Sequence, residues 1–166
     1  MTAKSEKIVE IIKKTQGLKD VVDVDQETVK VVIFRLSKNC FAFYGKDVKE
    51  IIGQYQLSWV PGLPGYLPGL LNIRGEIESA ISLQYLLEGA EAASGGMVVM
   101  VANEKFRTGV IVDEVCDVTD IPFQSIVLPL TTLQGMTNEL VSHGFNHKGE
   151  QVLLLDLEKL ESKVRL

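Results

Sequence analysis

The sequence predicts a mainly β protein built from two small antiparallel barrels. Three observations lead to this prediction. Short runs of β-branched and aromatic residues are separated by turn residues, which is typical of strands. These runs are not joined by the long helices that a parallel sheet needs for its crossovers. The two halves of the chain also repeat one pattern, and closing each small sheet into a barrel would remove its exposed edges.

The segment 1–28 differs from the rest of the chain. Residues 5–16 (SEKIVEIIKKTQ) carry apolar side chains at helical spacing, with Ser5 as a candidate N-cap and Gly17 as a stop. Residues 18–28 are acidic and weakly apolar, which indicates a spacer. We therefore expect residues 1–28 to form an N-terminal amphipathic helix and a spacer.

The main domain is expected over residues 29–162. TVKVVIFRL and NCFAFYG are predicted strands, and residues 37–39 between them form a hairpin turn. MVVMVAN and FRTGVIVDEVCDVT repeat this texture later, after the small, Gly-rich connection EGAEAASGG. The first barrel is therefore predicted at about residues 29–90 and the second at about 96–160, with some exchange of strands between them left open.

One motif occurs twice and relates the two halves. Asn, any residue, a basic residue, Gly and Glu follow each other in both copies. At an offset of 74, Asn72, Arg74, Gly75 and Glu76 correspond to Asn146, Lys148, Gly149 and Glu150. At an offset of 67 the earlier strands correspond as well, with Val31 on Val98. Because Asn and Gly favour turns, we predict two equivalent β-turn corners, each followed by a strand and a short helix capped by Ser82 or Asp156.

Composition excludes several classes of function. The chain has 17 basic and 22 acidic residues and a net charge of -5, which opposes phosphate backbones, so we expect no nucleic-acid partner. Cys40 and Cys116 are too few for a disulfide framework and form no CxxC motif. The N-terminus lacks the apolar core of a signal peptide, and no uncharged apolar run reaches about 18 residues. The sequence therefore predicts a cytoplasmic protein without direct membrane insertion.

Two motifs resemble those of CheW-like chemotaxis coupling proteins. The segment VPGLPGYLPGLLNIRGEI resembles the family pattern V-P-x-x-P-x-x-x-x-G-L-x-N-x-R-G-x-I, and TGVIVDEVCDV resembles G-[IV]-x-V-D-x-V-x-[DE]-V. The two motifs occur in the expected order, and the resemblance covers about residues 29–162. It implies a CheW-like fold of two SH3-like five-stranded β-barrels with short helices.

The same resemblance implies a function without catalysis. Members of this family are adaptors that bind the regulatory domain of the CheA-type histidine kinase and the cytoplasmic hairpin tips of chemoreceptors (methyl-accepting). We therefore expect a chemosensory adaptor with no enzymatic activity, cofactor or metal, recruited from the cytoplasm to membrane-associated receptor arrays. Many relatives have Pro and Asp where this chain has Ser79 and Ser82, which leaves its choice of partner open.

The resemblance also implies a set of partner-binding residues. The predicted set is Val48, Glu50, Gly69, Asn72, Arg74, Gly75, Val98 and Val99. Glu50 and Arg74 match positions that the family uses in receptor and kinase coupling, and Gly69 would allow a backbone to approach closely. The three valines match the apolar wall of a groove between the barrels.

Structural roles are the alternative for several of these residues. Val98 and Val99 are neighbours on a predicted strand and face opposite sides, so at least one should belong to the core. Arg74 could instead form an ion pair with Glu50 or Glu76 that orders the corner, because surface ion pairs are common and weak. The structural and partner-binding roles of Arg74 are compatible.

The Pro-rich loop of residues 60–68 has two interpretations. Its three prolines restrict the backbone, so that Leu63, Tyr66 and Leu67 could form a docking ridge at low entropic cost. Alternatively, these side chains close the end of the first barrel, because isolated apolar residues in loops usually point inward. Trp59 is expected in the core or at the barrel rim.

Catalytic and metal sites find little support in the sequence. His143 and His147 have a spacing that could bind zinc, with Asp156 as an orienting carboxylate, but no thiolates lie near them in the sequence. Cys40 or Cys116 with His143 could form a nucleophile and a base, yet both cysteines lie in predicted strands, where a free cysteine is usually buried. The sequence therefore predicts neither a metal nor a catalytic residue.

A second function, from a different class, is a small-molecule sensor. An apolar ligand would then occupy the cleft between the two barrels, lined by Val98, Met100, Phe106 and Tyr66. Such a sensor should be stabilised thermally by a metabolite, whereas an adaptor should respond only to protein partners.

Overall fold

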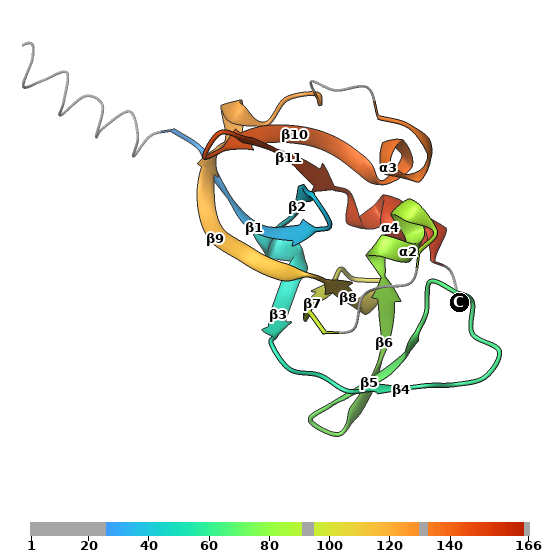
Figure 1. The fold of residues 1–166 in the computed structure, drawn as a ribbon. Helices are drawn as coiled ribbons and strands as arrows, with labels where there is room; N and C mark the ends of the chain where they lie inside the picture. The colour runs from blue at the N-terminus through green and yellow to red at the C-terminus, as the bar shows by residue number, and fades with distance from the viewer. Residues whose placement is uncertain (1–25, 91–94, 130–132, 165–166) are drawn as a thin grey trace, which may run out of the picture.

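Two β-sheets and a few short helices form the described part of the molecule (Figure 1). The structure is a computed structural model that describes residues 26–90, 95–129 and 133–164. The mainly β class predicted from the sequence is confirmed. The amphipathic helix predicted for residues 5–16 lies outside the described residues.

The strands follow the β-branched and aromatic runs of the sequence. In chain order they are β1 (Thr28–Leu36), β2 (Asn39–Tyr44), β3 (Val48–Ile52), β4 (Leu57–Ser58), β5 (Gly69–Ile73), β6 (Glu76–Ser82), β7 (Met97–Ala102), β8 (Arg107–Val112), β9 (Glu114–Pro122), β10 (Val141–His147) and β11 (Glu150–Leu155). The helices are α2 (Leu83–Glu88), α3 (Gly135–Leu140) and α4 (Leu157–Lys163), together with the 3-10 helices η1 (Gly45–Asp47) and η2 (Phe123–Ser125).

Each sheet combines strands from both halves of the chain. Sheet A has the strand order β10-β11-β2-β1-β9, and sheet B has the order β3-β7-β8-β6-β5-β4. β3 pairs antiparallel with β7 of the second half, and β9 pairs antiparallel with β1 of the first half. The ranges 29–90 and 96–160, predicted for the barrels, therefore do not coincide with the sheets. A repeat identifies equivalent segments, but strand partners depend on contacts between residues far apart in the sequence.

The two sheets nevertheless repeat one local arrangement. β5 and β6 form a hairpin, and β6 continues parallel to β8, with Ala80 beside Gly109. β10 and β11 form the equivalent hairpin, and β11 continues parallel to β2, with Val152 beside Cys40. The hairpins β1–β2 and β7–β8 supply these parallel partners, one in each sheet.

Equivalent turns close the β5–β6 and β10–β11 hairpins, as the repeated motif predicted. Both central residues of each turn have positive φ: Arg74 (53°), Gly75 (86°), Lys148 (51°) and Gly149 (82°). Two successive positive φ values define the type I′ turn, whose twist matches that of the flanking strands. The Gly75 N–H donates to Asn72 Oδ1 at 3.0 Å, and the Gly149 N–H donates to Asn146 Oδ1 at 3.2 Å. The two corners are therefore equivalent in turn type and in hydrogen bonding.

A short helix follows each hairpin and begins at the predicted cap. Ser82 Oγ accepts a hydrogen bond from Tyr85 N at 3.2 Å at the start of α2. Asp156 Oδ1 accepts hydrogen bonds from Glu158 N and Lys159 N at the start of α4. These bonds satisfy N–H groups that the first turn of a helix leaves unpaired.

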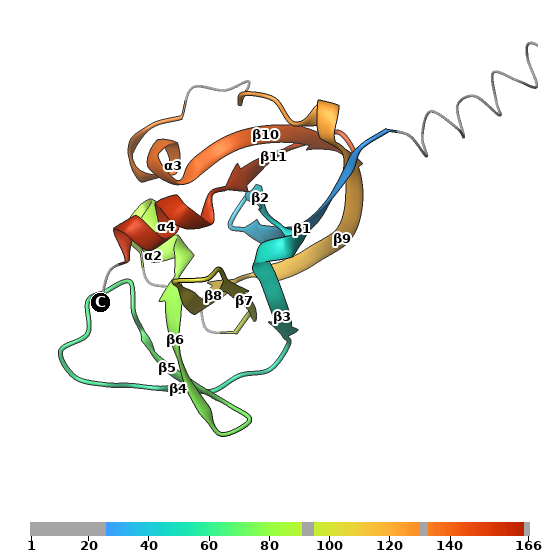
Figure 2. The same ribbon diagram turned by 180° about the vertical axis from the view of Figure 1, so that it is seen from behind.

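Three apolar clusters fill the interior. The largest takes residues from both sheets, including the fully buried Phe34, Phe43 and Val99, and so joins the sheets to each other. The rings of Phe34 and Phe43 stack with their centroids 5.5 Å apart. α2, α3 and α4 gather on one side of the molecule (Figure 2) and add Leu83 and Leu140, among others, to this central cluster. The two smaller clusters belong to sheet A and sheet B separately.

Candidate functional site

The exposed corner of the β5–β6 hairpin is tied to β3 by an ion pair. Both guanidinium Nη atoms of Arg74 donate to the carboxylate of Glu50, and Nη1 lies 3.2 Å from Oε2. The Arg74 side chain is 78% exposed, whereas that of Glu50 is 24% exposed. A two-bond pair with arginine fixes geometry as well as charge. Arg74 therefore forms the ion pair with Glu50 that was one alternative for ordering the corner, and most of its side chain still faces solvent.

Asn72 and Gly75 build this corner from within the hairpin. Both residues are exposed. The Asn72 side chain accepts the hydrogen bond from the Gly75 N–H, and the φ of 86° at Gly75 belongs to the left-handed region that glycine adopts without steric cost. These two residues therefore hold Arg74 at the tip, in a position that a partner could reach.

Gly69 allows a close backbone approach, but the approaching backbone belongs to the same chain. A Cβ at Gly69 would lie 2.7 Å from the carbonyl oxygen of Ser58 in β4. The neighbouring Leu70 pairs with Ser58 where β4 meets β5. Gly69 is buried, so it supports the position of β4 and offers no side-chain surface to a partner.

Val98 and Val99 do not form the wall of an open groove. Both are fully buried, Val98 in the sheet B cluster and Val99 in the central cluster. β7 lies inside sheet B between β3 and β8 and is covered on both faces, so opposite-facing neighbours are both inside. The alternative interpretation, that at least one is a core residue, is confirmed. Val48 is half-buried and packs against the central cluster.

Two apolar side chains in and next to sheet B are exposed, which the sequence did not predict. Ile77 is 63% exposed and lies on β6 directly opposite Asn72. Trp59, which the sequence predicted in the core or at the barrel rim, directly follows β4 and is 77% exposed, so it is not a core residue. A signal was available for Trp59, because Pro61 follows shortly after it and prevents β4 from continuing as a paired strand. For Ile77, burial depended on which face of β6 is covered.

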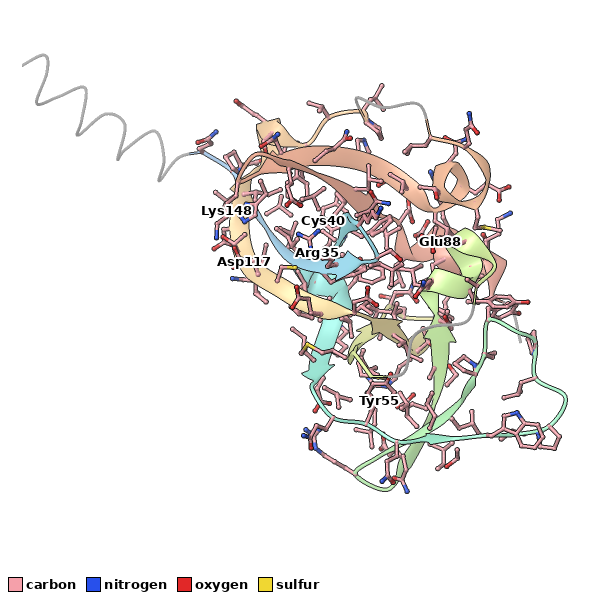
Figure 3. All side chains as sticks on the ribbon, in the orientation of Figure 1. Arg35, Cys40, Tyr55, Glu88, Asp117 and Lys148 are labelled. Carbon is pink, nitrogen blue, oxygen red and sulfur yellow. The ribbon has the colours of Figure 1, made fainter. Side chains whose placement is uncertain are left out.

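The second half of the chain rebuilds the corner with a weaker pair. Asp117 corresponds to Glu50 at the offset of 67, and Lys148 corresponds to Arg74 at the offset of 74. Lys148 Nζ is 3.7 Å from Asp117 Oδ2, and the two residues adjoin in Figure 3. His147 Nε2 is 3.0 Å from the same oxygen, and this hydrogen bond, together with Lys148, lowers the pKa of Asp117. The offset of 67 that relates the strands of the two halves therefore also aligns Glu50 with Asp117.

Comparison with known proteins assigns the chain to a family. The CheW-like domain profile matches residues 30–164. The chain belongs to the CheW-like family. Two relatives of this CheW-like chain are chemotaxis proteins CheW. The one from Treponema pallidum is 27% identical, and the match covers 86% of this chain and 88% of the relative. The one from Klebsiella aerogenes is 28% identical, and the match covers 88% of this chain and 90% of the relative. The family is one of chemotaxis scaffold proteins, as the resemblance implied.

A solved structure shares the fold of this CheW-like chain. The scaffolding protein TtCheW from Thermoanaerobacter tengcongensis superposes with a TM-score of 0.69 at 22% sequence identity. The match covers 78% of this chain and 90% of the other. In the part of the CheW-like chain that the structure describes, no helix is long and apolar enough to cross a membrane.

The cysteines and histidines of this CheW-like chain do not assemble a reactive site. Cys40 Sγ donates to Glu150 Oε2 at 2.9 Å, and Arg35 Nη2 donates to the same oxygen at 3.2 Å. Burial, reinforced by the bond to Glu150, raises the pKa of the Cys40 thiol to about 11, so the thiol stays protonated at neutral pH. Cys116 is exposed, and partial desolvation raises its pKa too. Neither thiol has the lowered pKa of a nucleophile.

No group of three metal-binding side chains occurs among residues 26–90, 95–129 and 133–164. His147 is held by Asp117. The Nδ1 atom of His143 is buried without a hydrogen-bond partner among the described residues. The two histidines therefore have separate environments and do not converge on one ion.

A hollow of about 1270 Å³ lies under the Pro-rich loop. Leu67 of this loop is buried and Tyr66 packs against the central cluster, so the inward-pointing interpretation is confirmed for these two side chains.

None of the four residues expected to line a sensor cleft borders the hollow. Val98 and Met100 are fully buried in the sheet B cluster, whereas Phe106 and Tyr66 pack against the central one. The cleft expected for a sensor is therefore not assembled from these residues.

Ser79 and Ser82 both have structural partners in this CheW-like chain. Ser79 Oγ lies 2.8 Å from Thr108 Oγ1 on the neighbouring β8, and Ser82 caps α2. The serine at position 82 thus performs the capping role that Asp156 performs in the second half. Both serine side chains are therefore used in hydrogen bonds within the fold.

Proposed function

We propose that this CheW-like chain is a non-enzymatic adaptor that couples the cytoplasmic hairpin tips of chemoreceptors to the regulatory domain of a CheA-type histidine kinase. Membership of the CheW-like family supports the proposal, and so do relatives named as chemotaxis and scaffolding proteins. The adaptor would work in the cytoplasm, at membrane-associated receptor arrays. It would require no cofactor, because its task is to hold two partners together.

The observation that carries the proposal is the preordered corner at Arg74. The turn and the two-bond pair with Glu50 place a mostly exposed guanidinium at the hairpin tip before any partner arrives. A preordered side chain loses less conformational entropy on binding, so the cost of binding is lower. Arginine is also among the residues that most often contribute a large share of the binding free energy at an interface. The exposed side chain of Ile77 beside it adds apolar surface.

The proposed docking corner is therefore centred on Glu50, Asn72, Arg74 and Gly75, with Ile77 as an addition. Gly69 and Val48 would support this corner indirectly by holding its strands in place. Val98 and Val99 would support it as buried core residues. This division follows from exposure: only side chains that reach solvent can contact a partner directly. The partner that the Arg74 guanidinium contacts would present carboxylates or carbonyl oxygens to it.

Binding measurements with purified partners test the proposal. The full chain is titrated by calorimetry against a CheA regulatory domain and against a receptor hairpin-tip fragment. We expect binding to both, and a loss of at least about tenfold in affinity for one or both in Arg74→Glu. Lys148→Glu is the matched control, because it changes the same position of the other corner, and it should bind like the wild type. Val98→Asp is unsuitable as a surface variant because it places a charge in the core.

If the folded wild type binds neither partner, the adaptor proposal fails. If Arg74→Glu and Lys148→Glu bind as tightly as the wild type, the adaptor role stands and the docking corner is wrong. Circular dichroism of each variant shows whether it is folded. Thermal shifts produced by metabolites in the absence of protein partners would instead favour a sensor.

A further inference from the structure

Three exposed apolar side chains follow β9 at one end of sheet A. Phe123 is 52% exposed, Val127 is 48% exposed and Leu128 is 74% exposed. They lie in and just after the 3-10 helix η2, and we call them the η2 patch. Three large apolar side chains are thus exposed within six residues of chain, and exposed apolar surface of this kind marks sites of interaction with another segment or partner.

The backbone beneath the η2 patch is firmly held. Val127 and Gly144 exchange two backbone hydrogen bonds, with N···O distances of 2.9 and 2.7 Å. The Ser125 hydroxyl donates to the Pro122 carbonyl at 2.6 Å. The half-buried Ile126, between Ser125 and Val127, packs against the sheet A cluster. The exposed apolar side chains are therefore presented from a fixed base, which lowers the entropic cost of docking onto them.

The chain enters the first sheet directly beside the η2 patch. The Phe123 N–H donates to the carbonyl oxygen of Glu27 at 2.9 Å, and Thr28 at the start of β1 pairs with Pro122 at the end of β9. In Figure 1 the blue start of β1 lies close to the short helix η2. Whatever precedes residue 26 must therefore leave the described structure next to the patch.

The segment that precedes this point has the sequence of an amphipathic helix. Residues 5–16 place Ile8, Ile11 and Ile12 on one face. A helix of this length is marginal by itself in water and needs an apolar surface to pack against. Residues 17–25 between it and the described structure could span up to about 30 Å, so the segment can return to the patch.

Charge also favours an occupant from this segment. Residues 1–16 contain four lysines and two glutamates, so they carry +2, whereas the whole chain carries -5. The remaining residues therefore carry -7. On β9, Asp120 is exposed near the patch, with Lys30 Nζ 3.5 Å from its Oδ1, whereas Glu114 lies at the opposite end of the strand. A segment with a net positive charge is attracted to a body with a net negative charge, and salt weakens this attraction beyond about 8 Å.

We propose that residues 5–16 dock as an amphipathic helix on the η2 patch of the same chain. The isoleucine face covers Phe123, Val127 and Leu128. The segment thus shields the patch from other proteins. This inference does not depend on the proposed adaptor function.

Hydrogen exchange on the full chain tests the docking. In the wild type, amides of residues 5–16 should exchange at least about tenfold more slowly than expected for an unstructured peptide. Leu128→Asp and Ile11→Asp, which act on the two sides of the contact, should each remove this protection. Ile77→Asp is the matched control, because it changes a similarly exposed apolar residue on the other sheet, and it should leave the protection unchanged.

Three results would overturn the inference. Unprotected exchange of residues 5–16 in the wild type would show that the segment does not dock. Protection that survives Leu128→Asp would show that it docks elsewhere. Protection that weakens on dilution of the protein, together with a mass above that of the monomer in light scattering, would show that a second copy supplies the contact.

Discussion

Arg74 and Lys148 adopt the same left-handed backbone conformation at the same position of two hairpin turns, with φ values of 53° and 51°. Their side chains, however, make different contacts. Arg74 makes two bonds to Glu50, whereas Lys148 shares Asp117 with His147 at a longer distance. The two corners thus share the turn and differ in the charged group at its tip. This difference is the reason for proposing the first corner, and not the second, as the docking site.

A charge swap separates the two roles of Arg74. In the double variant Glu50→Arg with Arg74→Glu, the ion pair can form again with its charges reversed. We expect thermal stability to stay within about 1 kcal/mol of the wild type, because an exposed pair contributes little, while partner binding remains at least about tenfold weaker. Thermal unfolding and calorimetry measure the two effects. Recovery of wild-type affinity would mean that Arg74 only orders the corner.

The glycines of the two turns should be equally sensitive to substitution. Gly75→Ala and Gly149→Ala each force a Cβ into a left-handed conformation, with φ of 86° and 82°. Each should lower the free energy of unfolding by about 1–2 kcal/mol, measured by urea denaturation. Gly53→Ala is the control, since a Cβ there meets no atom within 4 Å and φ is not positive. A loss in only one of the two turns would argue against their equivalence.

The two thiols should differ in reactivity toward a thiol-specific reagent such as Ellman's reagent. Cys116 is exposed, whereas Cys40 is buried, bonded to Glu150 and has its pKa raised to about 11. At pH about 8 we expect Cys116 to react at least about tenfold faster than Cys40, whose reaction should require unfolding. The fast phase should be absent in Cys116→Ser and present in Cys40→Ser. Equal rates in the native protein would contradict the buried environment of Cys40.

Acid should weaken the second corner. The pKa of Asp117 is lowered from 3.8 in the folded state, mainly by the hydrogen bond with His147. Its contribution to stability is therefore present above pH 3.8 and is lost as the pH falls through the folded pKa. The free energy of unfolding is measured by denaturant titration at several pH values. In Asp117→Asn it should fall less steeply with decreasing pH in this acid range than in the wild type.

His147→Gln provides a second measurement of the same effect. Glutamine cannot supply the imidazole that bonds to Asp117, so the acid dependence should again become shallower while the neutral protein remains folded. If both variants keep the acid dependence of the wild type, other carboxylates cause it.

Local features of the fold could be predicted from the sequence because they depend on neighbouring residues. The turn at Arg74 follows from Asn72 and Gly75, whose side-chain bond and positive φ lie within one turn of chain. The caps Ser82 and Asp156 follow in the same way from the first turn of each helix. Strand exchange could only be left open, because pairing of β3 with β7 joins residues about 50 positions apart in the sequence.

In the candidate site, too, local features could be predicted from the sequence, whereas the burial of its residues could not. Periodicity states that Val98 and Val99 face opposite sides of a strand, but it does not state how many of those sides are covered. Both are covered, since one cluster packs on each face of β7. Trp59 is not a core residue for the converse reason: a large apolar side chain is not buried unless another element reaches it.

The family, the mainly β class, the two equivalent turns and the helix caps after them could all be inferred from the order of residues alone. Three further features required the folded chain: which strands share a sheet, which valines are inaccessible and which acid holds Arg74. This difference arises because turn and cap hydrogen bonds form between near neighbours in the chain, whereas burial and ion pairing depend on where distant strands come to lie.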